Sequence, residues 1–76
     1  MEKIGKRAAT AIMERAARNG TTKSQEQEIL NLTRKTFRLW RRGENAPSAY
    51  FLQQMALAGY DVFWILTGQE GNNGKT

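Results

Sequence analysis

The chain has 76 residues and contains neither cysteine nor histidine. It can therefore form no disulfide framework, and it lacks the thiolate and imidazole ligands of common zinc sites. No apolar run approaches the roughly 20 residues of a membrane span, and there is no apolar stretch of a signal peptide in the opening residues MEKIGKRAAT. The simplest expectation is one small cytoplasmic domain that folds without staples, metal or cofactor.

The sequence also offers little for catalysis. No glycine-rich phosphate loop follows a strand pattern, and no pair of carboxylates shares an apolar face. Glu26 and Glu28 stand two residues apart in a segment with helical character, so their side chains point apart. We therefore expect neither an enzyme nor a small-molecule ligand.

Positive charge is concentrated in one short segment. The chain carries 12 lysines and arginines against 7 acidic residues, which gives a formal net charge of +5. The segment of residues 34–42 contains no acid and five basic residues: Arg34, Lys35, Arg38, Arg41 and Arg42. Such a local excess indicates a defined footprint for phosphate. The alternative is a solvated helix face, but no acid stands three or four residues away within the segment to relieve the repulsion.

A first helix is predicted over residues 2–18, because apolar residues recur there three and four positions apart. They form one stripe: Ile4, Ala8, Ala11, Ile12 and Ala16. The charged residues, Arg7 among them, fall mostly outside this stripe. Asn19 and Gly20 tolerate the left-handed conformation and end the helix.

A second, short helix is predicted over residues 23–30. Thr22 and Gln25 have the form of a capping box, in which a hydroxyl and an amide satisfy backbone groups at the start of a helix. The apolar face of this helix is thin and consists of Ile29 and Leu30. Asn31 and Leu32 then break the helix.

A third helix is predicted over residues 33–42, with Thr33 as its cap and Gly43 at its end. Phe37 and Trp40 stand three residues apart, share one side and are expected to face the core. The basic residues lie largely around the other side. Stacking of Trp40 on a nucleobase is the alternative, but the helical spacing favours core packing.

Two further helices are predicted in the last third of the chain. The segment SAYFLQQMALAGY follows the single proline, and its apolar face consists of Ala49, Leu52, Met55 and Ala56. Asp61 can cap a last helix over residues 62–66, whose apolar face consists of Val62, Ile65 and Leu66. The expected architecture is all-α: a compact five-helix domain over residues 1–68 and a flexible tail over residues 69–76.

Two motifs carry a resemblance to a known family. One is WRRGENAPS, residues 40–48, and the other is GYDVFWILTG, residues 59–68. With the order of the helices, they make residues 4–68 resemble the lambda-repressor-like helix-turn-helix domain of phage repressors, Cro proteins and their bacterial relatives. The resemblance implies a supporting helix over residues 23–30 and a recognition helix over residues 33–42 that enters the major groove of DNA.

The resemblance also implies roles for single residues by position. The positions that usually face base edges hold Arg34, Lys35, Arg38 and Leu39. The positions that usually touch phosphate hold Thr22, Lys23, Thr33 and Arg42. Arginine and lysine suit the acceptors of guanine, and leucine can meet the methyl group of thymine.

Three positions depart from the family pattern. Glu26 and Gln27 stand where relatives usually carry leucine and alanine, and Asn31 stands where they usually carry glycine. Asparagine tolerates the left-handed conformation better than most residues. For the polar pair, either the helix is rotated or slid relative to the family, or the two side chains are accommodated near the edge of the domain.

Phe63 lies away from the apolar face of its helix, where relatives usually carry a polar residue. An exposed phenylalanine marks a contact patch, so we expect a homodimer interface at Tyr60, Phe63 and Trp64. The alternative is that Phe63 packs under the tail.

These features predict a sequence-specific regulator of transcription that binds double-stranded DNA, a phage or prophage repressor of the Cro type. A dimer on a palindromic operator would occlude polymerase. One alternative is a regulator that uses this fold to bind a protein partner, as antitoxins do, although only a short segment follows Gly68. Another is a protein that binds RNA or single-stranded DNA.

Overall fold

Five helices and no strand make up residues 3–69, the part of the chain described by the computed structural model. They are α1 (Ile4–Asn19), α2 (Lys23–Ile29), α3 (Arg34–Arg42), α4 (Ala49–Leu57) and α5 (Val62–Thr67). The predicted all-α class with five helices is confirmed. Within this range, no helix is both long and apolar enough to pass through a membrane. Most of the predicted tail, residues 70–76, lies outside the described residues.

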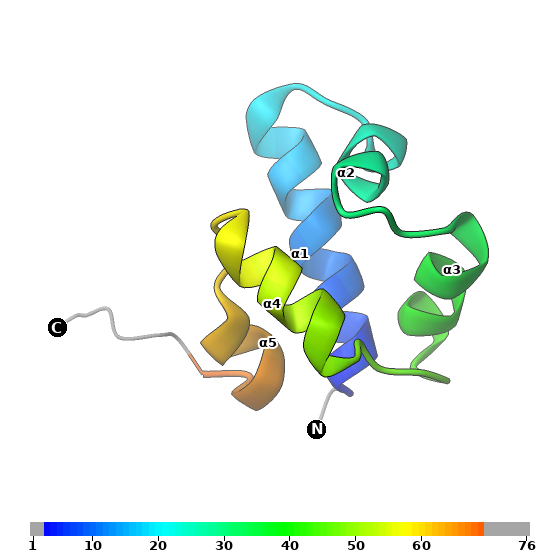
Figure 1. Ribbon diagram of the computed structural model, residues 1–76, viewed down its shortest axis with the longest axis vertical. Helices are drawn as coiled ribbons and strands as arrows, with labels where there is room; N and C mark the ends of the chain where they lie inside the picture. Colours follow the sequence, from blue (N-terminus) through cyan, green and yellow to red (C-terminus); the bar gives the residue numbers. More distant parts are fainter. Residues whose placement is uncertain (1–2, 70–76) are drawn as a thin grey trace, which may run out of the picture.

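The longest helix, α1, is the centre of the fold. It contacts α2, α3 and α5, while α4 packs on α5 and crosses in front of α1 in the view of Figure 1. The α2 and α3 helices lie on one side of α1, and α5 lies on the other (Figure 1). The core between them is formed by Ala8, Ala9, Ile12, Leu30, Leu32, Phe37, Trp40, Met55, Tyr60 and Ile65.

Local capping determines where the helices begin and end. The capping box at α2 is confirmed: the Gln25 backbone N–H donates to the Thr22 hydroxyl at 3.1 Å, and the Thr22 N–H donates to the Gln25 side chain at 2.8 Å. Thr33 and Asp61 cap α3 and α5 as predicted. In the turn after α2, Asn31 adopts a left-handed conformation with φ of 57°, which explains why asparagine is acceptable there.

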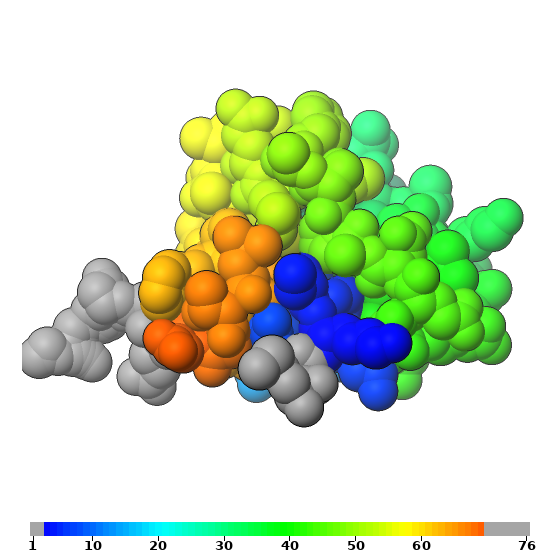
Figure 2. All heavy atoms as spheres, turned by 90° about the horizontal axis from the view of Figure 1, so that it is seen from below, coloured from blue at the N-terminus to red at the C-terminus, as the bar shows by residue number. Residues whose placement is uncertain are grey.

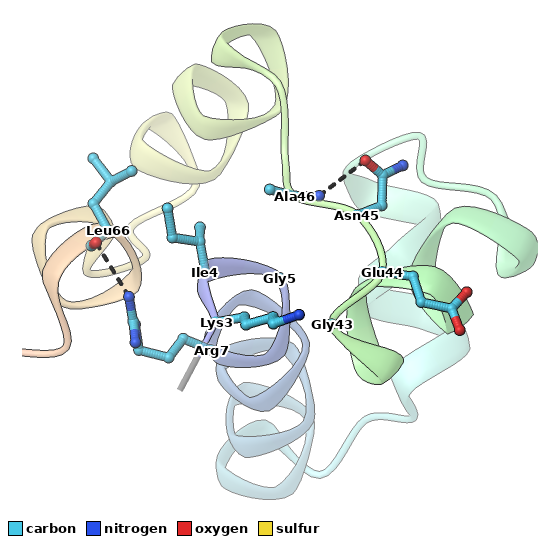
Figure 3. Close-up of a pocket in the computed structure, with 9 residues that line it drawn as sticks. All are labelled: Lys3, Ile4, Gly5, Arg7, Gly43, Glu44, Asn45, Ala46 and Leu66. Carbon is cyan, nitrogen blue, oxygen red and sulfur yellow. Dashed lines mark hydrogen bonds between the residues drawn. The ribbon is translucent and has the colours of Figure 1, made fainter. Parts of the chain in front are cut away.

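The start of α1 lies close to the segment that follows α3. Figure 2 shows this first turn, in blue, between α5 in orange and the green segment after α3. The approach depends on Gly5, because a Cβ atom at this position would collide with the carbonyl oxygen of Asn45 (Figure 3). A close contact between α1 and the end of α3 therefore fixes where α3 lies on the domain.

Arg7 belongs to the charged residues that fall mostly outside the apolar stripe of α1, and yet its side chain is buried. The guanidinium donates from Nε to the carbonyl oxygen of Ile65 at 2.8 Å. It also donates from Nη2 to the carbonyl oxygen of Leu66 at 3.1 Å (Figure 3). These carbonyls belong to the last turn of α5, where backbone acceptors lack partners within the helix. Arg7 thus joins α1 to α5 through the backbone carbonyls at the end of α5.

Three predicted apolar faces also need correction. Of the two apolar residues predicted to form the inner face of α2, Ile29 is exposed and Leu30, which follows the last residue of the helix, is buried. In α4 the core side is formed by Phe51, Leu52, Met55 and Ala58, so Leu52 and Met55 were predicted correctly whereas Ala49 and Ala56 are exposed. In α5, Val62 and Ile65 face the core as predicted, but Leu66 is 43% exposed and Trp64 packs against the core instead. In α4 the inner side holds Phe51, Leu52 and Met55, which bury more apolar area than Ala49 and Ala56 would.

Candidate nucleic-acid interface

The inner side of α3 is anchored by two aromatic residues. Phe37 and Trp40 are both buried, as their spacing predicted. The Trp40 ring meets Phe51 of α4 edge to face, with 5.6 Å between the ring centroids. This packing leaves Trp40 unavailable for stacking on a base and fixes the rotation of α3 about its own axis.

The rotation of α3 turns all its charges outward. The exposed side chains are Arg34, Lys35, Arg38, Arg41 and Arg42. Leu39, predicted to meet a base, is half-buried at the margin of this surface. Within residues 3–69, the one ion pair that this surface makes joins Arg42 to Glu44 at 3.9 Å, with both side chains more than half exposed. Such a pair adds little stability, so the surface keeps its excess of positive charge.

The cations of α3 form two stripes. Arg34, Arg38 and Arg41 face the start of α2 and line a groove of about 210 Å³ together with Lys23. The rest of the groove lining consists of Ser24, Gln27 and Phe37. Lys35, Leu39 and Arg42 are spaced by four and three residues and follow the next stripe around the helix. Of the residues predicted to read bases, Arg34 and Arg38 therefore lie nearer to α2 than Lys35 and Leu39 do.

The residues predicted to touch phosphate surround the two helix starts and the end of α3. Thr22, Lys23, Thr33 and Arg42 are all exposed. The Thr33 hydroxyl caps the Thr36 N–H at 3.1 Å and donates its hydrogen to the Thr36 hydroxyl at 2.9 Å, so it is engaged within the helix. The Thr22 hydroxyl accepts the capping bond at the start of α2. Its own hydrogen stays available for an oxygen acceptor such as phosphate.

Glu26 does not lie at the edge of the domain; it is 3% exposed and part of the interior. Its carboxylate accepts from the Thr21 hydroxyl at 2.6 Å and from the Tyr60 hydroxyl at 3.5 Å. The Arg15 guanidinium lies over the Tyr60 ring, 3.9 Å from its centroid. Glu26 is therefore accommodated by a buried polar cluster that it forms with Thr21, Tyr60 and Arg15.

The surroundings of this cluster change the pKa of the Tyr60 hydroxyl. Burial raises the pKa of Tyr60 to about 12, and the Glu26 carboxylate adds to this rise while the Arg15 charge opposes it. The neutral phenol is thereby kept as a donor to Glu26 over a wide pH range.

Gln27, the second departure, is also buried, at 4% exposure, but its side chain has no hydrogen-bond partner within residues 3–69. A buried polar group without a partner costs about 1 to 3 kcal/mol. Neither Gln27 nor Ser24 was predicted to belong to a site, and Arg41 was predicted as part of the basic segment but without a role of its own. The signal was nonetheless present in the sequence: Arg41 continues the spacing of Arg34 and Arg38, and Ser24 and Gln27 stand three residues apart on α2.

Two lysines at the start of α1 extend the basic surface, and sequence reasoning missed them as well. The side chains of Lys3 and Lys6 lie next to Gly43, at the end of α3. Figure 3 shows Lys3 directed toward Gly43. Their charges therefore stand near those of Arg41 and Arg42, although about 35 residues separate them along the chain.

The residues predicted to form a dimer interface divide into two groups. Phe63 is 52% exposed, and Leu66, one turn further along α5, is exposed beside it. Trp64 is half-buried and packs partly on the core. Tyr60 is buried, and its hydroxyl faces Glu26, so its ring contributes to the interior of the domain. The apolar surface that α5 presents consists of Phe63 and Leu66, with the exposed part of Trp64.

The fold and this surface define a class: a small all-α domain that presents one basic helix, with a separate apolar patch on its last helix. No family model matches the chain, and neither a curated protein nor a solved structure matches it.

Proposed function

We propose that the chain is a transcriptional regulator that binds double-stranded DNA in a sequence-specific manner, with α3 in the major groove. The observation that carries this proposal is the outer side of α3. It presents five cations and no acid, on a helix whose orientation is fixed by Phe37 and Trp40. Clustered cations repel one another, and a polyanion such as DNA relieves that repulsion.

The arrangement of α2 and α3 supports a helix-turn-helix use of this surface. Residues 30–33 connect the two helices, which contact each other and share the basic groove. In helix-turn-helix domains the second helix reads base edges while the first lies across the backbone. Lys35 and Leu39 would then face bases, and Lys23 and Arg42 would contact phosphates on either side.

The apolar patch on α5 supports a dimer of the Cro type. Phe63 and Leu66 belong to α5, and α5 lies on the other side of α1 from α2 and α3, so two copies joined through α5 would keep both α3 helices free (Figure 1). Two α3 helices would enter successive major grooves about 34 Å apart on a palindromic operator. Bound in this way, the dimer would repress transcription by occluding polymerase.

Two substitutions on the outer side of α3 test the division of roles. Lys35→Ala should lower the discrimination between operator and random DNA by about 1 to 3 kcal/mol, because a base contact carries sequence information. Arg42→Ala should weaken binding to both kinds of DNA and reduce the salt slope by about one unit, because a phosphate contact releases counterions.

Fluorescence anisotropy with both duplexes at several salt concentrations measures these effects. Gln53→Ala, an exposed substitution on α4, is the control and should change neither. An equal loss on both duplexes for Lys35→Ala and Arg42→Ala would contradict the assigned roles.

A further inference from the structure

The side chain of Gln27 is the most unusual feature of the groove between α2 and α3. Gln27 is 4% exposed, lines the groove, and makes no side-chain hydrogen bond to any residue between 3 and 69. The neighbouring Glu26 is equally buried but accepts two hydrogen bonds. Buried polar groups in folded proteins are nearly always paired, so an amide left without a partner indicates a ligand that supplies one.

The other polar groups around Gln27 are all able to donate. Lys23, Arg34, Arg38 and Arg41 line the groove, and none of its lining residues is acidic. Ser24 adds a hydroxyl at the rim. Ammonium and guanidinium groups are donors only, and the amide and hydroxyl can donate as well as accept. The complementary ligand therefore carries negative charge and several acceptors.

The size of the groove limits that ligand. A volume of about 210 Å³ is several times the roughly 30 Å³ of one water molecule, which is enough for a tetrahedral oxyanion with a few waters. The wall that Phe37 provides is apolar and rigid, because its ring is held in the core. The cations around the groove can meet the charge of such an ion from several directions.

We propose that this groove is a binding site for one phosphate group, with the Gln27 amide as a donor at its back and the four cations around it. The group can come from the backbone of DNA or from a free phosphate. The DNA source rests on the proposed function, whereas the phosphate chemistry does not. A backbone phosphate seated here would contact α2 and α3 at once and would fix the depth at which α3 enters the groove of DNA.

The direct test is titration of the full chain with inorganic phosphate, against chloride at the same ionic strength. The side-chain amide signal of Gln27 in a ¹H–¹⁵N spectrum should shift and saturate with phosphate alone. The melting temperature should rise by about 6 to 11 °C at ten times the dissociation constant, because the ligand binds the folded state only. A signal that does not saturate, or that responds equally to chloride, would overturn the assignment.

Gln27→Leu keeps the volume of the side chain and removes the amide. In chloride it should melt higher than the wild type, because the unpaired buried amide is gone. Its response to phosphate should fall at least about tenfold. Gln53→Leu on α4 is the matched control and should respond like the wild type.

Ser24→Ala, at the exposed rim, gives a second variant with an unperturbed interior and should bind phosphate about twofold more weakly. Full phosphate binding by both Gln27→Leu and Ser24→Ala would exclude this groove.

Duplex DNA of random sequence distinguishes the two sources. If the backbone supplies the phosphate, Gln27→Leu should weaken duplex binding about tenfold for every sequence, and inorganic phosphate should compete. If Gln27→Leu loses phosphate binding but binds duplex like the wild type, the source is a free phosphate group. Phosphate binding by a wild type that binds no duplex would refute the proposed function while supporting the site.

Discussion

Two charged residues, Arg7 and Glu26, lie in the interior of this small domain. Burial of a charge is unfavourable unless hydrogen bonds replace the lost water. Arg7 donates to two backbone carbonyls of α5, and Glu26 accepts from the hydroxyls of Thr21 and Tyr60. Each residue thus joins segments far apart in the chain. A substitution that removes only one side of either interaction leaves a buried group unpaired, which lowers the stability of the fold.

Tyr60 predicts a specific dependence of stability on pH. Its pKa in the folded chain is raised to about 12 from an ordinary value of 10.0, so folding favours the neutral phenol. The stability that this preference contributes is fully present below pH 10 and is lost as the pH rises toward 12. Because solvent partly screens the effect, a loss of about 1 to 2 kcal/mol is expected.

Urea unfolding between pH 8 and pH 12 measures this loss. Tyr60→Phe should show a flatter profile than the wild type, because it has no proton to lose at this position. Tyr50→Phe, at an exposed position, should follow the wild type. Parallel profiles for wild type and Tyr60→Phe would show that the phenol does not stabilise the fold in this way.

At the scale of helices, local chemistry decided how much was predictable. The start of α2 depends on Thr22 and Gln25, and the end of α3 on Gly43, all of which lie within a few residues of the boundary they set. Those boundaries were predicted correctly. The buried sides of α2, α4 and α5 were predicted only in part, because the choice between two overlapping apolar stripes depends on which neighbouring helix covers them.

The candidate site was likewise predicted where local spacing determines it and missed where packing between helices does. The cations of α3 were predicted to lie on one exposed side because their spacing is helical, and their exposure is confirmed. The groove was not predicted, because it forms only where α2 meets α3. It includes Gln27, whose polar side chain was treated in the sequence only as a departure from an expected apolar position. Lys3 and Lys6 were not predicted to belong to the basic surface, because they are far from Gly43 in the sequence and only the fold brings them next to it.

The contact between α1 and α5 predicts a local effect of Arg7→Lys. Lysine keeps the charge but cannot present the planar fork that reaches the carbonyls of Ile65 and Leu66 together. We expect the free energy of unfolding to fall by about 2 to 3 kcal/mol, since hydrogen bonds to charged groups contribute about 1.5 to 3 kcal/mol.

Hydrogen exchange locates the effect of this substitution. The amides of α5 should exchange faster in Arg7→Lys, while those of α3 should change less. Arg18→Lys, at an exposed position near the end of α1, should alter stability by less than about 0.5 kcal/mol. A uniform change across all helices would mean that Arg7 does not act through α5.

At the scale of the whole molecule, charge and apolar surface are separated. The cations of α2 and α3 lie on one side of α1, and α5, which carries the exposed Phe63 and Leu66, lies on the other (Figure 1). The two surfaces come closer at the start of α1, where Lys3 lines one pocket together with Leu66. A surface for a polyanion and a surface for a second protein can therefore be occupied together. This separation is what a dimeric DNA-binding protein requires.

Phe63→Glu tests the apolar surface. A charge at the centre of a small apolar contact should shift the monomer–dimer equilibrium toward monomer by at least about tenfold. Analytical ultracentrifugation measures the shift. Tyr50→Glu, which replaces an aromatic residue of similar exposure on α4 at 57%, should leave the equilibrium unchanged. An unchanged mass for Phe63→Glu would remove α5 from the interface.

The central claim is that two copies of the chain bind double-stranded DNA together, each with its α3 helix in the major groove. The most direct measurement is selection of bound sequences from a random duplex library, followed by determination of the mass of the complex. We predict a two-fold symmetric motif with half-sites about one helical turn apart, bound by two copies of the chain. Recovery of no sequence motif, or preference for single-stranded DNA or RNA over duplex at matched salt, would contradict it.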